Sequence, residues 1–542
     1  MANTSPARLY QSKSRYVIGL LGVFALLSLG LLCLWTLGGT GLTTALFTSL
    51  FQDSYLSYVV FITVKQSLLS VFFATIIGMA GAIAFHRRAK FPLRSWLLIG
   101  CFSAMIMPTT VAAVGLLKLW GQSGLIAQTP LIALLPDRLG LWSVILAHVF
   151  FNAPLVLRVC LSALEAVPLS QKRQAALLCL SAKDYFMIMD WPVIRAVLPS
   201  IMGLVFLLCF TSFSLVLMLG GGPAVTTLEV SIYTSLRFDF NLPQAAFLSF
   251  LQLIICAVLL RLFGRGRSAA TALQRPIGDD GQRADCTPLV MKLVDFTIIS
   301  TIIILNIIPI ILLLVQSDFI AGLPLLAGSR FWHAFVNSVT LACGSAGFAL
   351  CFAFILGFLA HECRLRGRFF LLHLIEISHS LFLIIPALVL GTALFILLRN
   401  AINLSAHALW LLMLGNGLLA LPFCYRIIAP ALGRHLAETD GLSAMLNLSG
   451  GKRLVTVILP SLRAEIGFAL GLSAALSFGD LGIITLFGSQ SFETLPYMLF
   501  QFLNRYGANE ADLLAVILLA TSIGLYSFFI KIVALWGRYI AR

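Results

Sequence analysis

One acidic side chain, Asp480, lies in the middle of the apolar run 464–487. An ionised group inside a bilayer is costly unless it is paired or hydrogen-bonded, so an acid in such a run is a candidate functional residue. Asp480 can contact a positively charged solute that crosses the membrane. It can instead accept hydrogen bonds within the protein beside Gly479 and Gly482, and both interpretations stay open.

Three further residues, His373, Glu376 and His379, are of types that ligate metal ions. A spacing of three residues rotates successive side chains by about 300° around a helix, so the trio drifts around the axis and we expect no metal site. The chain also lacks the G-x-x-x-x-G-K-[ST] loop that binds nucleotide phosphates. We therefore expect no catalytic residues and no cofactor in this chain, and any ATP hydrolysis must come from a separate subunit.

The composition requires that apolar helices hold these groups. Of 542 residues, 60% are hydrophobic and only 11% are charged, and the mean hydropathy is +1.00. Each membrane span needs about 20 residues, so a water-soluble fold is excluded and an all-α integral membrane protein with about twelve spans is predicted. The expected spans are 16–38, 57–85, 95–119, 141–164, 197–219, 244–263, 293–315, 334–360, 369–398, 407–430, 464–487 and 512–537. The first run is too long for a signal peptide and is interpreted as a retained span.

The net charge of +15 indicates topology rather than a nucleic-acid partner. With an even number of spans and the N-terminus inside, 29 of the 36 Lys and Arg residues lie in cytoplasmic segments or at their ends. Basic residues concentrate on the cytoplasmic side of membrane proteins, so both termini are predicted to be cytoplasmic.

An internal repeat divides the chain into two permease-like halves, 1–263 and 293–542, which a polar cytoplasmic linker, 264–292, joins. The first half comprises the span 16–38 and a transmembrane core of about 57–263. One constant offset, without gaps, places Pro154 on Pro422, Arg158 on Arg426 and Pro192 on Pro460. The same offset places Ser212 on Asp480, so we expect both residues to line a solute path.

The best-matched parts of the repeat are two long inner loops, 165–196 and 431–463. A connection between helices needs only a few residues, so about 30 residues of moderately polar sequence at the same face of both halves favour a functional role. In the first loop, the segment 171–185 is expected to form a short helix along the membrane surface. Pro192 and Pro460 then mark the return to the bilayer.

These loops resemble the coupling loop of binding-protein-dependent ABC importer permeases. That pattern begins Glu-Ala-Ala, has a glycine four residues after the second alanine, and ends Leu-Pro. Both copies here lack the glutamate, and Cys179 and Asn447 replace the glycine. The resemblance implies that the loops contact the ATPase through Arg173, Gln174, Ala175, Ala176, Cys179 and Pro192 in the first copy and Ser443, Ala444, Asn447 and Pro460 in the second.

Longer stretches resemble the fused permeases of bacterial thiamine and thiamine diphosphate importers, namely 144–154, 219–233, 477–482 and 492–496. The resemblance implies one fused permease chain in the inner membrane. It also implies two copies of a cytoplasmic ATPase subunit, which bind ATP and Mg²⁺, and a periplasmic substrate-binding protein. We expect the outer turn at Gly221, together with Glu229, to contact that binding protein.

Two alternatives remain at this point. Fused ferric-iron permeases share the duplicated architecture, so the solute is open. A secondary transporter also commonly has twelve spans in two halves. The matched long inner loops and the lack of a charged series within the spans favour the ATP-driven class.

Overall fold

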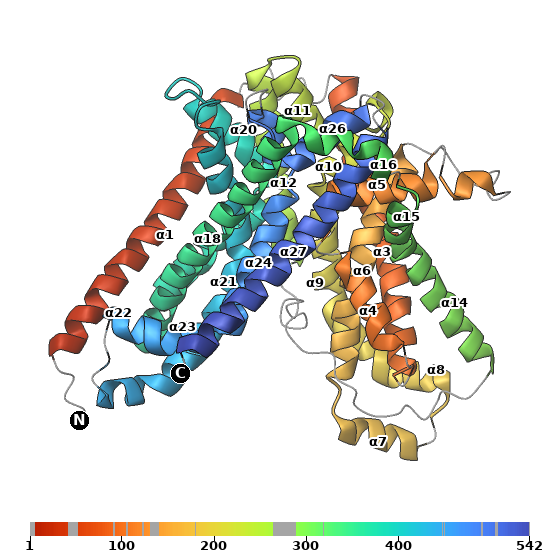
Figure 1. The fold of residues 1–542 in the computed structure, drawn as a ribbon. Helices are drawn as coiled ribbons and strands as arrows, with labels where there is room; N and C mark the ends of the chain where they lie inside the picture. The colour runs from red at the N-terminus through yellow and green to blue at the C-terminus, as the bar shows by residue number, and fades with distance from the viewer. Residues whose placement is uncertain are drawn as a thin grey trace. The chain divides into compact units, whose positions relative to one another are not determined.

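The structure, a computed structural model, consists of helices (Figure 1). The residues that it describes are 6–41, 53–89, 91, 93–104, 107–121, 124–129, 140–178, 180–263, 289–317, 319–446, 448, 450–488, 492–504 and 508–540. Every regular element in these ranges is helical, as expected of an all-α membrane protein. Backbone groups in a bilayer must be satisfied internally, and a helix satisfies its own.

Nine helices in the described ranges are long and apolar enough to cross a membrane, or up to eleven if two bent pairs are counted. They include Val17–Gly39, close to the expected first span. The integral membrane class is therefore confirmed, whereas the number of twelve spans and the cytoplasmic location of both termini stay predictions.

Two expected spans are broken by proline. The run 95–119 forms α4 (Arg94–Ser103) and α5 (Thr109–Trp120), and the run 369–398 forms α19 (Phe369–Ile384) and α20 (Ala387–Leu398), with a 97° bend between the latter two. Pro108 and Pro386 directly precede the second helix of each pair. Proline disfavours helical backbone in the residue before it, so the helix is interrupted ahead of each of these prolines. The prediction from apolar runs alone did not take this effect into account and therefore gave single spans.

One compact unit comprises residues 47–231 and 254–319. Its centre is α3 (Ser54–Arg87), which packs on α6 (Leu141–Glu165) and α9 (Trp191–Phe210). Two helices from the start of the second half, α14 (Leu289–Asn306) and α15 (Ile308–Val315), pack on α3 and α5 respectively.

The other compact unit comprises residues 1–46, 232–253 and 320–542. Its centre is α18 (Ser329–Leu365), which packs on α21 (Ala408–Met445) and α24 (Arg463–Phe478), and α24 packs on α27 (Ala508–Ile540). The opening helix of the chain, α1 (Pro6–Gly41), lies along α18. Each unit thus combines most of one sequence half with the opening helix of the other half, and the unit centred on α18 also contains residues 232–253 of the first half.

Some short helical elements recur along the chain at a constant offset. A π-helical turn at Phe186–Asp190 recurs at Leu454–Ile458, and α10 (Ser214–Leu219) recurs as α25 (Gly482–Phe487), both at the offset that places Pro154 on Pro422. The remaining helices are α7 (Leu169–Leu177), α8 (Ala182–Tyr185), α11 (Leu228–Arg237), α12 (Leu242–Phe263), α16 (Phe319–Gly322), α17 (Pro324–Ala327), α22 (Gly450–Arg453), α23 (Leu459–Ser461) and α26 (Leu495–Asn504), with short 3₁₀ turns at Ile126–Gln128 and Pro223–Val225.

Gly78 lets α3 and α6 approach closely. A Cβ at this position would lie 2.6 Å from the backbone oxygen of Ala153 and 2.6 Å from Cβ of Val156. We expect Gly78→Val to destabilise the protein by about 1–3 kcal/mol because the backbone oxygen cannot yield easily. Thermal unfolding in detergent measures this effect.

The matched control is Gly347→Val, since a Cβ at Gly347 in α18 meets nothing within 4 Å. Both variants carry the same change of helix propensity. Equal melting temperatures for the two variants would show that the α3–α6 contact is looser than the structure has it.

Candidate functional site

The first inner loop begins where α6 ends, at Glu165, and contains α7. Ser181 starts the next helix, because its Oγ accepts a hydrogen bond from the backbone N–H of Asp184 (3.2 Å) and donates one to the Asp184 carboxylate (2.6 Å). From 182 to 210 the chain forms one helical span of 29 residues. Pro192 occupies its interior at the start of α9, directly after the π-helical turn.

The side chains of α7 differ in exposure. Arg173 and Gln174 are exposed, whereas Ala175 is only 4% exposed. Ala176 lies in α7, but its side chain lies outside the description, as does all of Cys179. Two large apolar side chains at the end of the helix, Leu177 and Leu178, are 84% and 72% exposed. A short helix is thus present as α7, followed by a separate short α8, whereas its position along the membrane surface stays a prediction.

The second inner loop differs from the expected one at its start. Residues 431–445 continue α21, which contains Pro422 and Pro430 in its interior and ends at Met445. Proline is tolerated within membrane helices because neighbouring groups satisfy the freed carbonyls. Ser443 is buried, Ala444 lies in α21 without a described side chain, and Asn447 lies outside the described residues.

The end of the second loop also differs in shape from the first. Pro460 lies in α23, and the helical segment Gly451–Ser461 meets Arg463–Phe478 at an angle of 79°. The corresponding part of the first half is a single span. The two loops therefore share a short helix followed by a π-helical turn, but they differ at their start and in their exit into the membrane.

An ion pair anchors the start of the first loop. The Arg94 guanidinium of α4 contacts the Glu165 carboxylate at the end of α6, and the two side chains are 8% and 9% exposed. Arg94 Nε also donates to the backbone oxygen of Phe85 (3.3 Å). These contacts fix the residue from which the chain enters α7.

We expect Arg94→Ala to destabilise the protein by about 3–5 kcal/mol, because Glu165 then keeps a buried charge without this partner. Thermal unfolding of the purified chain measures the change. The double variant Arg94→Ala, Glu165→Ala removes both charges and should recover most of the lost stability. A double variant no more stable than the single one would contradict this role of the pair.

Asp480 lies in the break between α24 and α25. Its Oδ1 accepts a hydrogen bond from the backbone N–H of Gly482 (3.0 Å), and its Oδ2 accepts one from Ile483 (3.3 Å). The buried side chain of Asn416 on α21 lies beside the carboxylate. The capping interpretation of Asp480 is thus confirmed, whereas contact with a solute stays a prediction. An acid at the N-terminus of a helix also complements the helix dipole.

The matching break in the first half, at Ser212, is held by other residues. Gln66 of α3 donates from Nε2 to the backbone oxygen of Cys209 (2.9 Å), an acceptor at the end of α9. Asn152 of α6 donates from Nδ2 to Cys209 Sγ (3.4 Å), and Ser70 Oγ lies 3.0 Å from His148 Nδ1. Sequence analysis missed this buried polar cluster, although its polar residues interrupt apolar spans.

The outer turn has the backbone expected of glycine. Gly221 and Gly222 have φ of 71° and 110°, a region that side chains with a Cβ rarely adopt, and both residues are exposed. Glu229 departs from expectation, because it is only 1% exposed at the start of α11 and presents little surface to a binding protein. Contact through Gly221 stays a prediction.

In each half, a hydroxyl group on a long helix accepts a hydrogen bond from the backbone of the segment expected on the outer side. Thr63 Oγ1 of α3 accepts a hydrogen bond from the backbone N–H of Leu228 (2.9 Å), and Ser338 Oγ of α18 accepts one from Leu495 (2.8 Å). In the second half Arg330 also binds both carboxylate oxygens of Glu493, at 2.7 and 2.8 Å. Sequence analysis did not identify these contacts, which join residues far apart in the chain.

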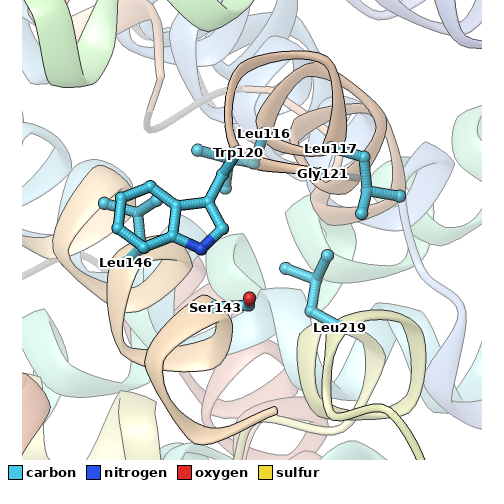
Figure 2. Close-up of a pocket in the computed structure, with 7 residues that line it drawn as sticks. All are labelled: Leu116, Leu117, Trp120, Gly121, Ser143, Leu146 and Leu219. Atoms are coloured by element: carbon cyan, nitrogen blue, oxygen red, sulfur yellow. The ribbon is translucent and has the colours of Figure 1, made fainter. Parts of the chain in front are cut away.

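A small cavity lies at the end of α5, and its open space totals about 190 Å³, solvent included (Figure 2). Pockets for small-molecule ligands usually measure about 300–1,000 Å³, so this cavity is too small to hold a vitamin-sized solute. The residues lining it are mostly apolar: Leu116, Leu117, Trp120, Gly121, Ser143, Leu146 and Leu219. In the described ranges no three His, Cys, Asp or Glu side chains are grouped to hold a metal ion.

Many apolar helices, several of which recur at a constant offset, define the class as a multi-pass membrane protein with an internal repeat. No family model matches the chain. It is 35% identical over 476 residues to the thiamine transport system permease protein ThiP of Brucella melitensis, covering 86% of each chain. Its identity to ThiP of Escherichia coli is 33% over 479 residues, covering 87% of this chain and 88% of that one, and to ThiP of Haemophilus influenzae it is 30% over 482 residues, covering 88% and 89%.

The chain therefore belongs to the family of thiamine transport system permease proteins. The relatives are transport permeases, so the expectation that this chain is a permease rather than an enzyme agrees with its family.

Proposed function

We propose that this protein is the membrane-spanning subunit of an ATP-driven importer that carries thiamine or thiamine diphosphate across the bacterial inner membrane. The observation that carries the proposal is the similarity to ThiP proteins along 86–88% of the chain in the three relatives compared. The many apolar helices of the described ranges agree with it. A ferric-iron solute has no comparable support.

The proposed complex contains two copies of a cytoplasmic ATPase subunit, which bind ATP and Mg²⁺, and a periplasmic binding protein that delivers the solute. This single fused chain supplies both permease halves. Two observations support this composition: the sequence has no phosphate-binding loop of its own, and its two inner loops share a short helix followed by a π-helical turn. Each loop would receive one ATPase copy. In the first loop Arg173 and Gln174 are exposed for this contact, whereas Ala175 and, in the second loop, Ser443 are buried and would support the loops from within.

Transport would proceed by alternating access, with movement of the ATPase subunits passed to the two halves through the inner loops. Asp480 and Ser212 would line the solute path at the breaks of α24 and α9. Thiamine carries a positive charge on its thiazolium ring, which a capped carboxylate complements. The support for this role is the position of Asp480 between two helices and its buried polar neighbour Asn416.

Uptake by cells with and without the gene tests this function. We expect uptake of labelled thiamine to be lost on deletion and restored by the gene, while uptake of ferric iron is unchanged. Loss of iron uptake alone would overturn the thiamine assignment. Uptake that persists without any ATPase subunit would instead favour a secondary transporter.

A further inference from the structure

The two helices proposed to receive the ATPase carry opposite charges. The segment 169–177, which is α7, contains Lys172 and Arg173 and no acid. The matching segment 437–445, at the end of α21, contains Glu438 and Asp440 and no base. Lys172 and Asp440 even occupy equivalent positions in the two copies of the repeat.

The charged side chains described in these segments include one exposed residue in each. Arg173 is exposed on α7, and the Glu438 side chain is 70% exposed on α21. Lys172 is 6% exposed. His435 lies 3.9 Å from the Glu438 carboxylate, and Arg453 donates to Thr439 Oγ1 of the same segment (3.5 Å), so the acidic segment has two basic neighbours. Arg173 and Glu438 are therefore the charges best placed to meet a partner.

The two segments resemble each other in the large apolar residues at their C-terminal ends. Leu177 and Leu178, at the end of α7, are 84% and 72% exposed, and their counterparts Met445 and Leu446 are 87% and 61% exposed. Large apolar side chains with such exposure at matched positions of both inner loops form a surface that a protein partner can cover. Both ATPase copies present the same surface. Each copy can therefore bind the apolar pair of its own loop in the same way.

We infer that the ATPase subunit docks on both loops through the apolar pair, while charge strengthens docking at one loop and weakens it at the other. The inference rests on the proposed function. A single ATPase surface of either sign meets a basic helix at one site and an acidic helix at the other. Charges at the rim of an interface change mainly the rate of association, and salt screens their effect. The two docking sites are therefore electrostatically unequal.

The test uses the purified complex of this chain with its ATPase subunit and measures the ATPase retained per permease at low and high salt. Arg173→Glu and Glu438→Lys each change the charge of one loop, in opposite directions. We expect opposite changes of about two- to fivefold in the ATPase dissociation constant at low salt, and much smaller changes at high salt. Leu178→Ser and Leu446→Ser should both weaken docking at either salt concentration.

Gln171→Asn, an uncharged change at an exposed position of the same helix outside the residues proposed to contact the ATPase, is the matched control and should leave retention unchanged. Shifts in the same direction for the two charge variants, or no shift in either at low salt, would overturn the inference. If the wild-type chain retains no ATPase at all, the proposed function fails instead, so the two failures are distinguishable.

Discussion

Replacement of Ala175 by glutamate should reduce thiamine uptake at least about 100-fold while the chain remains inserted in the membrane. Ala175 is 4% exposed within α7, so a glutamate there either buries an unpaired charge or displaces the helix. Burying such a charge costs several kcal/mol, and each 1.4 kcal/mol lowers the equilibrium population of the intact loop about tenfold. The initial rate of labelled thiamine uptake, normalised to the amount of permease in the membrane fraction, measures the effect.

The matched control is Gln174→Glu, which places the same charge one residue earlier at an exposed position. It should lower transport by at most a few-fold, far less than Ala175→Glu, because its charge stays exposed to water. We expect Ala176→Glu and the matching Ala444→Glu to act like Ala175→Glu. Each inactive variant should also lose ATPase subunits on purification. Normal transport by Ala175→Glu with the ATPase detached would contradict the coupling role of these loops.

The second large effect is expected at Asp480, where capping and charge can be separated. Serine, which the first half has at the equivalent Ser212, keeps an oxygen that can accept from a helix N-terminus but carries no charge. If Asp480 binds the thiazolium, Asp480→Ser should raise KM for thiamine by about 10- to 150-fold and leave the maximal rate nearly unchanged, as expected for loss of a charged contact of about 1.5–3 kcal/mol.

Asp480→Ala removes both the cap and the charge. It should lower the maximal rate as well as raise KM, and it should reduce the melting temperature of the purified chain, since loss of a cap costs about 1 kcal/mol. Uptake assays over a range of thiamine concentrations separate the two parameters. A wild-type KM in Asp480→Ser would show that Asp480 caps α25 and does not contact the solute.

The class of fold was predictable from composition, because 60% hydrophobic residues can be accommodated only in a membrane. The breaks within two expected spans were not, since apolar sequence runs continuously through Pro108 and Pro386. Proline ended a helix at these two positions but not at Pro422, which lies inside α21. The difference depends on which neighbouring helices satisfy the backbone, and that information is tertiary.

The internal repeat of the sequence made part of the candidate site predictable. The constant offset between the two halves located both inner loops and the pairing of Ser212 with Asp480. It did not show that Glu229 is buried or that Gln66 binds the end of α9, because these depend on contacts between helices far apart in sequence. The polar residues within the apolar sequence of α3 were the only signal of this contact, and the sequence does not indicate which residues they bind.

Transport by purified components tests the central claim most directly. This chain is reconstituted into proteoliposomes with its ATPase subunit and the substrate-binding protein, and labelled thiamine is supplied on the binding-protein side. We predict accumulation that requires ATP, the ATPase subunit and the binding protein, and that persists when ion gradients are dissipated. Accumulation driven by an ion gradient without ATP, or ATP-dependent transport of ferric iron but not thiamine, would contradict the account.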